Sequence, residues 1–413
     1  MSRNTESADR YDVVIIGAGP GGVSAAMLLS RRGHSVWLIE RQVFPRFVTG
    51  ESLLPRCNDL LEEAGLLDAV KAQNYFVKQG ARFVREGSVC EFSFAEQFSK
   101  SYPSTWHVPR DHFDKVLSDT AQEQGVPVFF QTTVTSVKTG SEPQVVCVGE
   151  KGRERVIRCK FIVDASGYGR VLPRLLGLDV PSAFPIRKSV FTHVEDGGRS
   201  GASKTGQTWV IWQASDVWFW IIPFSSGRTS LGVVAGLDFY KRLPLEPAAL
   251  LRTAMEQDPF LAEQFGDAAF LFEPRVIEGY SIGVKQLFGD GYCLVGNTTE
   301  FLDPVFSSGV TLALESANRA AKVLSRQLSG EEVNWQHDYA DYMMRGVNTF
   351  RTYVEGWYDG SLPSIFFAPR QEPDIKRKLC SVLAGHVWDL DNPFVMDHKR
   401  KLPQLAQLVA RMS

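Results

Sequence analysis

The sequence predicts an α/β fold with a doubly wound parallel sheet covered by helices, a second β-rich unit and a helical C-terminal region. Three observations carry this prediction. An apolar, β-branched run at residues 11–16 leads through a glycine-rich turn into a helical pattern. Two later runs, at residues 161–167 and 291–297, have the same buried-strand character. A tryptophan-rich strand pattern lies between them at residues 217–223.

Length, charge and cysteine content narrow the class of protein. At roughly 150 residues per domain, the 413 residues correspond to two or three domains. The net charge is −2, which argues against a partner such as nucleic acid or a membrane surface. The six cysteines form no C-x-x-C pair and the seven histidines show no ligand spacing, so we expect neither a disulfide framework nor a metal site. The polar first ten residues lack a signal core, which favours a soluble cytoplasmic protein.

The N-terminal elements are a strand, a glycine motif, a helix and a second strand. Residues 17–22 read G-x-G-x-x-G, and apolar residues at helical spacing follow as far as Gly33. The second strand, at residues 35–39, ends at Glu40. In such a unit the helix N-terminus faces a diphosphate, and the acid accepts hydrogen bonds from a ribose diol.

Each glycine of this motif has a physical task. Gly17 permits the tight turn, Gly19 lets the backbone approach a pyrophosphate, and Gly22 lets the helix pack closely. A lone motif would also fit a glycine-rich turn without a ligand. The flanking strand, helix and acid together indicate a bound dinucleotide, although this stretch does not distinguish FAD from NAD.

The middle of the chain supplies the remaining strands. Alternating residues between 126 and 160 predict a β-meander. One strand then runs into Asp164 and Gly167, another ends at Asn297, and a long helix is expected to begin near Ser307. A meander inserted between two halves of a doubly wound sheet is a split Rossmann arrangement.

This arrangement resembles the FAD-dependent monooxygenase superfamily, and the resemblance implies FAD as cofactor. In that superfamily an arginine in an R-x-x-F-D segment, here Arg110, approaches the flavin chain. A D-x-x-G at a strand end, here Asp164 and Gly167, helps to hold the pyrophosphate and ribityl groups. This chain has Asn297 where an aspartate is typical, so that side chain can bond a ribityl hydroxyl without adding charge. No second G-x-G-x-x-G suggests a separate nicotinamide domain.

The mid-chain strand reads W-x-W-x-I-P, and alternation places Trp218 and Trp220 on one face. Such a pair fits plain core packing as well. The whole motif, however, is similar to the signature of flavin-dependent halogenases. Further similar segments are the G-E-x-x-x-P at 50–55, the lysine segment at 77–83 and the stretch at 301–310. The similarity covers at least residues 11–330 and is closest to the branch that acts on phenols and pyrroles.

The resemblance implies a reaction and its residues. A separate flavin reductase supplies reduced FAD, which uses O2 and halide (chloride or bromide) to make hypohalous acid. The acid passes to the catalytic Lys78, whose desolvated amine bonds the halogen or donates a hydrogen bond to the acid. Halide lies near helix N-terminal amides at Ser308 and Gly309, although Ser307 could simply be an N-cap. The implied cofactor contacts are Gly17, Gly19, Gly22, Glu40, Arg41, Glu51, Ser52, Arg110, Asp164, Gly167, Asn297 and Pro304.

The implied site wall is Trp218, Trp220 and Phe306, and the last of these bears on the substrate. The tryptophan-acting branch has a glutamate at the place of Phe306, which can stabilise a cationic ring. A phenylalanine cannot, so we expect a phenol or pyrrole that activates itself, free or tethered to a carrier protein. Basic clusters at 370–378 and 399–401 fit either solvated helix faces or a dock for an acidic carrier protein.

The expected domains follow from these segments. The FAD-binding domain is discontinuous, over residues 1–85, 105–182 and 285–330, and the β-rich substrate domain covers 86–104 and 183–284. Residues 331–413 form the helical region. The competing function is a related aromatic hydroxylase or oxidase that consumes NADPH and uses no halide. Lys78 together with W-x-W-x-I-P favours the halogenase.

Overall fold

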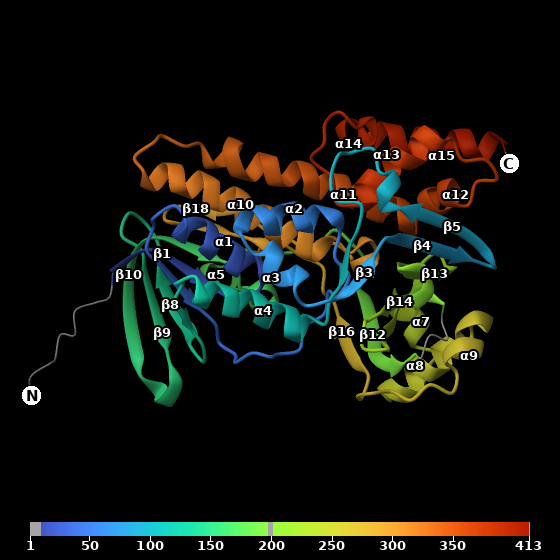
Figure 1. The fold of residues 1–413 in the computed structure, drawn as a ribbon, viewed down its shortest axis with the longest axis horizontal. Coiled ribbons are helices and arrows are strands. Elements are labelled where there is room, and N and C mark those ends of the chain that lie inside the picture. Colours follow the sequence, from blue (N-terminus) through green and yellow to red (C-terminus); the bar gives the residue numbers. More distant parts are fainter. Residues whose placement is uncertain (1–9, 197–200, 413) are drawn as a thin grey trace, which may run out of the picture.

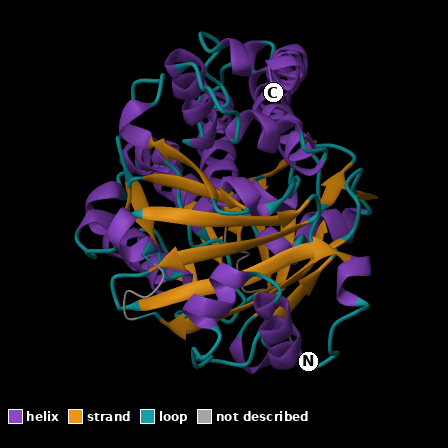
Figure 2. Ribbon diagram, turned by 90° about the vertical axis from the view of Figure 1, so that its right-hand side faces the viewer, coloured by secondary structure: helices purple, strands orange, loops and turns teal. Residues whose placement is uncertain are grey.

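A computed structural model describes residues 10–196 and 201–412. Two sheets lie next to each other, and helices from the last quarter of the chain run along one side of both (Figure 1). Seen from the end that carries the second sheet, the strands occupy the middle and the C-terminal helices lie above them (Figure 2). The predicted α/β class, with its β-rich second unit and helical end, is confirmed.

The first sheet has the strand order β18-β19-β10-β1-β2-β7. Its strands are β1 (Arg10–Ile16), β2 (Val36–Ile39), β7 (Val128–Phe129), β10 (Glu154–Asp164), β18 (Phe288–Gly289) and β19 (Tyr292–Leu294). β1 is parallel to both neighbours, with Ile16 level with Ile39 and with Asp164. The carboxyl ends of these strands therefore meet at one edge, where ligands bind in such sheets.

The predicted meander is present as β8 (Thr133–Lys138), β9 (Gln144–Val148) and the first half of β10, all antiparallel. The end of the meander expected up to residue 160 and the buried run expected from residue 161 form one continuous strand. Its first half alternates between exposed and buried residues and pairs with β9, whereas its last four residues are buried on both faces between β1 and β19. One strand thus serves both parts of the sheet.

The second sheet has the order β16-β12-β15-β14-β13-β4-β5. Its strands are β4 (Gly80–Arg85), β5 (Ser88–Ser93), β12 (Arg187–Glu195), β13 (Gln207–Ala214), β14 (Val217–Pro223), β15 (Arg228–Gly236) and β16 (Arg275–Glu278). The expected domain boundary after residue 85 differs from this arrangement, because β4 pairs with β13 and β5. Two short pairs stand apart, β3 (Phe76–Lys78) with β6 (Thr105–His107) and β11 (Asp179–Pro181) with β17 (Ile282–Val284).

Helices cover these sheets. Those of the first unit are α1 (Pro20–Ser30), α2 (Pro55–Ala64), α3 (Leu67–Lys71), α4 (Arg110–Glu123) and α5 (Val171–Leu176). Four lie around the second sheet: α6 (Ala202–Thr205), α7 (Leu237–Tyr240), α8 (Pro247–Glu256) and α9 (Pro259–Phe265). The last are α10 (Ser308–Leu328), α11 (Tyr342–Tyr358), α12 (Ser361–Phe366), α13 (Pro373–Leu383), α14 (Pro393–Met396) and α15 (His398–Met412). The long helix expected near Ser307 is α10.

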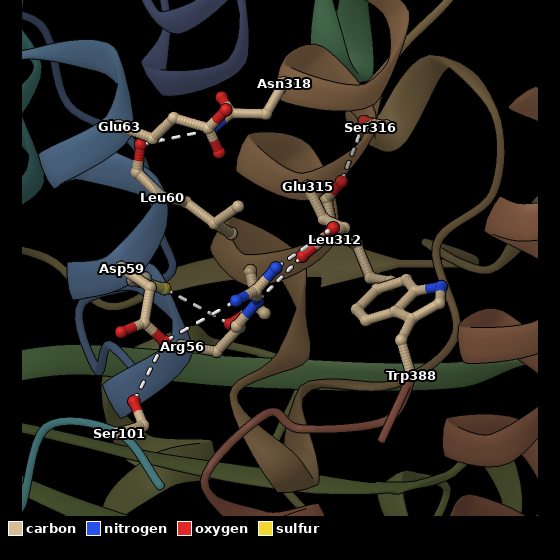
Figure 3. A network of polar contacts seen from close by, with 12 residues as sticks. Arg56, Asp59, Leu60, Glu63, Ser101, Leu312, Glu315, Ser316, Asn318 and Trp388 are labelled. Carbon is tan, nitrogen blue, oxygen red and sulfur yellow. Dashed lines mark hydrogen bonds and ion pairs between the residues drawn. The ribbon is translucent and has the colours of Figure 1, made fainter. Parts of the chain in front are cut away.

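A polar network ties α2 to α10 (Figure 3), and a residue of α11 joins it. Arg56 of α2 donates two hydrogen bonds to Glu315 of α10, at 2.9 and 3.3 Å, and lies 3.6 Å from Asp59. Tyr342 of α11 donates to the same glutamate at 2.7 Å. Glu315 is only 5% exposed on its side chain, so removing Arg56 would leave a buried charge unpaired. The network therefore fixes the position of α10.

All six cysteines are buried free thiols. Across residues 10–196 and 201–412, no helix combines the length and apolar character needed to cross a membrane.

Candidate active site

A cavity of about 590 Å³ runs between the two sheets, a size typical of small-molecule sites. At one end it is lined by the glycine turn after β1, and at the other by the tryptophan strand β14 and the start of α10. All but four of the residues expected in the site line this cavity. The exceptions are Gly22, Lys78, Asp164 and Phe306.

The glycine turn opens directly onto α1. Gly17 has φ +98°, and a Cβ there would meet the carbonyl oxygen of Ala165 at 2.6 Å. Gly22 does not line the cavity but packs against the turn itself. A Cβ on it would lie 1.8 Å from the Gly17 carbonyl oxygen. Gly19 lines the cavity at the N-terminus of α1. The turn thus presents backbone amides to the cavity, as a diphosphate requires.

Glu40 holds the turn as well as facing the cavity. Its carboxylate accepts hydrogen bonds from the backbone N–H of Ala18 at 3.0 Å and of Gln42 at 2.9 Å. Arg41 is exposed at the cavity edge beside it. Each oxygen thus has one backbone partner and can accept a further hydrogen bond, and binding of a ribose by Glu40 stays a prediction.

Two arginines stand over this end of the cavity. Arg110 donates to both oxygens of Asp114, at 2.9 and 3.2 Å, and to the Thr49 carbonyl at 2.7 Å. Arg46, which sequence motifs did not reveal, lies 3.2 Å from Asp114 and 3.8 Å from Glu40. Its Nη2 would stand 3.6 Å from a Cβ at Gly19, and its buried Nε has no partner in the described residues.

These observations fit FAD. The glycine turn, the α1 N-terminus and Arg46 would hold the diphosphate, with spare donors on the arginine and the amides. Gly167, with φ +58°, and Asn297 line the next part of the cavity, where the ribityl chain would lie. Pro304 and the start of α10 would face the flavin ring.

Asp164 has a different place from the one expected. It is fully buried behind the cavity wall, where it accepts hydrogen bonds from the backbone N–H of Ser166 at 2.9 Å and of Leu172 at 2.6 Å. Burial raises the pKa of this carboxyl. The aspartate shapes the turn that carries Gly167 and does not itself line the cavity.

Glu51, which lines the cavity, pairs with a histidine that the sequence analysis missed. The Nε2 atom of His193, on β12, lies 2.8 Å from the Glu51 carboxylate. Both side chains are buried, and the rings of Phe47, Phe224 and Phe272 surround the imidazole.

The N-terminus of α10 reaches the cavity through Ser307, Ser308 and Gly309. Ser307 occupies the N-cap position with φ +57°, yet no side chain caps this helix. The Ser307 side chain therefore does not form the N-cap hydrogen bond that the sequence left open. Uncapped amides at the start of a 21-residue helix suit an anion such as halide.

The two tryptophans lie on the same face of β14, with ring centroids 6.0 Å apart, and both line the cavity. Trp220 Nε1 donates to Ser230 at 3.0 Å, and Trp218 Nε1 donates to Tyr358 Oη at 3.0 Å. Tyr358 in turn donates to Asp303 at 2.9 Å. Burial raises the pKa of Asp303 to about 6, against hydrogen bonds that lower it.

Phe306 is not part of this wall. It ends a short 3₁₀ turn, Pro304–Phe306, and its ring packs in the second core, 6.5 Å from the ring of Tyr353 and 6.1 Å from that of Trp357. The left-handed backbone of Ser307 that follows redirects the chain, so that Ser307 and Ser308 take the cavity positions.

Lys78 ends β3 directly behind the cavity wall. Its Nζ donates hydrogen bonds to Ser52 Oγ at 2.8 Å and to the Leu53 carbonyl at 2.9 Å. Ser52 itself lines the cavity. Lys78 is 2% exposed, and this burial lowers the pKa of its amine to about 7. A lysine in such a place is half neutral near neutral pH and can act as a nucleophile.

Comparison with known proteins agrees with this geometry. The sequence profile of a family described as FAD binding domain matches residues 10–347. The chain is 28% identical to a 1H-pyrrole-2-carbonyl-[peptidyl-carrier protein] brominase of Pseudoalteromonas luteoviolacea, covering 92% of this chain and 93% of that protein. It is 27% identical to the corresponding chlorinase of Pseudomonas fluorescens, covering 95% and 93%.

Solved structures of flavoproteins share the fold over almost the whole chain. The structure of a flavoprotein/dehydrogenase from Cytophaga hutchinsonii superposes with a TM-score of 0.95 at 47% identity, over 98% of this chain and 99% of that one. The structure of the flavin-dependent brominase Bmp2 superposes with a TM-score of 0.86 at 26% identity, over 98% and 100%.

Fold and cavity therefore define an FAD-binding oxidoreductase of the FAD-dependent monooxygenase superfamily. Within that superfamily the chain belongs to the flavin-dependent halogenases. Its cofactor is FAD, and halide and O2 are the cosubstrates of this enzyme class.

Proposed function

We propose that this enzyme halogenates an electron-rich aromatic ring, a phenol or a pyrrole, by passing hypohalous acid from the FAD cavity to Lys78. The observation that carries the proposal is the buried lysine. It stands one side chain behind the cavity wall, with an amine whose pKa burial lowers to about 7.

Bound FAD, once reduced, supplies with O2 the oxidising power that converts halide to hypohalous acid. The chain provides the setting. Uncapped amides at Ser308 and Gly309 would hold the halide, and Trp218 and Trp220 form a rigid apolar wall that excludes water. No second glycine motif offers a nicotinamide site, so a separate flavin reductase is the expected source of reduced FAD.

The amine of Lys78 then handles the halogen. Neutral Nζ attacks the halogen of hypohalous acid, so that an N–halogen bond forms and the O–halogen bond breaks. The departing hydroxide takes a proton from nitrogen and leaves as water. A ring carbon next attacks the halogen, the N–halogen bond breaks, and the proton lost by the ring restores the amine.

The chain offers little help to an unactivated ring. Phe306 replaces a carboxylate and points into the core, and buried Asp303 is occupied by Tyr358 and the backbone N–H of Val305. A phenol or pyrrole spreads its developing positive charge onto its own heteroatom, so the enzyme need only position it. The two carrier-protein relatives support a pyrrole carried on a peptidyl carrier protein as one form of this substrate.

The basic clusters bear on that carrier. Lys378 forms an ion pair with Asp374, and Arg400 pairs with Asp397, so part of each cluster is already neutralised. Lys376 lies over the ring of Phe92 at 5.7 Å. Arg370, Lys376, Arg377, Lys399 and Lys401 have no ion pair among the described residues, and an acidic carrier would depend on these for charge complementarity.

The test is a reconstituted reaction with a purified flavin reductase, FAD, NADH, bromide or chloride, and a panel of phenols and pyrroles, free and carrier-bound. Halogenated product that requires reductase and halide is the expected result. Robust, substrate-stimulated NADPH consumption by the enzyme alone, with hydroxylated product, would instead establish the hydroxylase.

A further inference from the structure

A chain of buried hydrogen bonds links Lys78 to the proline of the tryptophan motif. Lys78 Nζ donates to Ser52 Oγ, Ser52 Oγ lies 2.8 Å from Thr208 Oγ1, and Thr208 Oγ1 lies 2.8 Å from His107 Nε2. His107 Nδ1 lies 3.0 Å from the carbonyl oxygen of Pro223. Lys78 and the three side chains between it and that carbonyl are each at most 6% exposed, and Ser52 and Thr208 also line the cavity.

The Pro223 carbonyl determines which atom donates in each of these hydrogen bonds. A carbonyl oxygen only accepts, so His107 Nδ1 must carry the proton that it shares with Pro223. Burial, and then the charge of Lys78, hold the pKa of His107 well below its ordinary value, so the ring is neutral and Nε2 is an acceptor. Thr208 must therefore donate to Nε2, and the Thr208 oxygen accepts the hydroxyl proton of Ser52.

This direction determines what Ser52 can do for the lysine. Because its own proton is given to Thr208, the Ser52 oxygen faces Lys78 as an acceptor only. A neutral amine has two N–H groups and one lone pair. Both N–H groups are used, toward Ser52 and the Leu53 carbonyl, and no other hydrogen-bond partner of Nζ occurs among the described residues.

We infer that Thr208 and His107 are positioning residues that keep the lone pair of Lys78 free for the halogen. The inference rests on the proposed function, in which that lone pair attacks hypohalous acid. Without the Thr208 hydroxyl, the Ser52 proton has no acceptor in the chain and turns to the lone pair of Nζ. The amine of Lys78 would then be neutral, but its lone pair would be occupied by the Ser52 hydroxyl.

The backbone near these side chains is held by its own hydrogen bonds, which do not involve the Thr208 hydroxyl. Leu53 N–H donates to the Trp106 carbonyl at 3.1 Å, and Val108 N–H donates to the Glu51 carbonyl at 2.8 Å. Lys78 is level with Thr105 in the β3–β6 pair. A change of one hydroxyl at Thr208 is therefore expected to redirect a proton and leave the surrounding strands in place.

Thr208→Val tests the inference, because valine has nearly the shape of threonine but no hydroxyl. Thr208→Ser retains the hydroxyl and should behave as the wild type. Thr349→Val is the matched control, since Thr349 is equally buried but donates to the Arg345 carbonyl within α11. Bound FAD, measured by absorbance, should be unchanged in all three.

Two readouts are needed. In the reconstituted reaction, Thr208→Val should lose about tenfold or more in halogenation rate at alkaline pH, the effect of one misdirected hydrogen bond. Titration of ¹⁵N-lysine-labelled protein by NMR should show the Lys78 Nζ midpoint moving to lower pH, because a donated proton stabilises the neutral amine. Cys57 and His107 are the titratable groups that act on Lys78, and both stay neutral over this range.

The outcomes separate the two claims. Absence of halogenated product from the wild type would remove the proposed function. An active wild type with a Thr208→Val variant that keeps its rate and its Nζ midpoint would overturn the inference alone. So would a Thr208→Ser variant that loses activity as the valine variant does, because the hydroxyl would then not be the cause.

Discussion

Trp218 and Tyr358 join the tryptophan motif to the last turn of α11. Trp218 Nε1 donates a hydrogen bond to Tyr358 Oη at 3.0 Å, and the tyrosine hydroxyl donates one to the Asp303 carboxylate at 2.9 Å. Asp303 starts the 3₁₀ turn that precedes α10. One tyrosine of the helical region thus holds both the cavity wall and the segment that leads to the expected halide site.

Tyr358→Phe should therefore destabilise the protein by about 1–3 kcal/mol, because it leaves the buried Trp218 N–H without an acceptor and removes a donor from Asp303. Urea unfolding at constant pH measures the change. Tyr353→Phe is the matched control, since Tyr353 is also buried but its hydroxyl makes only a 3.4 Å contact with the Phe394 carbonyl. Equal losses in the two variants would show that the Trp218 contact contributes nothing special.

Lys78 should make stability depend on pH in a defined direction. In the unfolded chain the amine stays protonated up to its ordinary pKa of 10.5, whereas in the folded protein it loses its proton near pH 7. Between these values the unfolded state binds more protons, so this residue makes the folded protein more stable as pH rises above about 7.

Lys78→Met removes that dependence while filling nearly the same volume. The free energy of unfolding of the wild type minus that of the variant should rise between about pH 7 and about pH 9, and should be flat below about pH 6. Urea unfolding of both proteins across this range measures it. A difference that is constant with pH would mean that Lys78 is charged in the folded protein.

Gly22 and Gly33 differ in the space that a side chain would find. Gly22→Ala places a Cβ 1.8 Å from the Gly17 oxygen, so the glycine turn must deform and FAD binding should be lost. Gly33→Ala has open space around it and pays only for its φ of +86°, about 1 kcal/mol. Absorbance of bound FAD in the purified proteins distinguishes them, and full FAD content in Gly22→Ala would contradict the role given to that turn.

Local sequence patterns were enough for the first sheet and the cavity ends. The G-x-G-x-x-G turn, the meander and the start of α10 lie where periodicity and glycine spacing place them, and alternation puts Trp218 and Trp220 on one face. These features depend on residues close together in the chain. Their physical cause, backbone geometry or strand pleat, acts over a few residues.

What the sequence did not reveal depends on distant pairing. β4 joins the second sheet through β13, more than a hundred residues away. Phe306 turns into the core because the backbone of Ser307 is left-handed, a feature that no pattern marks. The contacts of His107 with Thr208 and Pro223, and the place of Arg46, arise only when separate loops meet.

The central claim is that Lys78 transfers the halogen. The most direct measurement compares wild type and Lys78→Met in the reconstituted reaction, with halogenated product and O2 consumption recorded in the same assay. The variant should bind FAD and consume O2 as the wild type does, because Lys78 does not line the FAD cavity, while product falls to background. Product from Lys78→Met at the wild-type yield per O2 would contradict the claim.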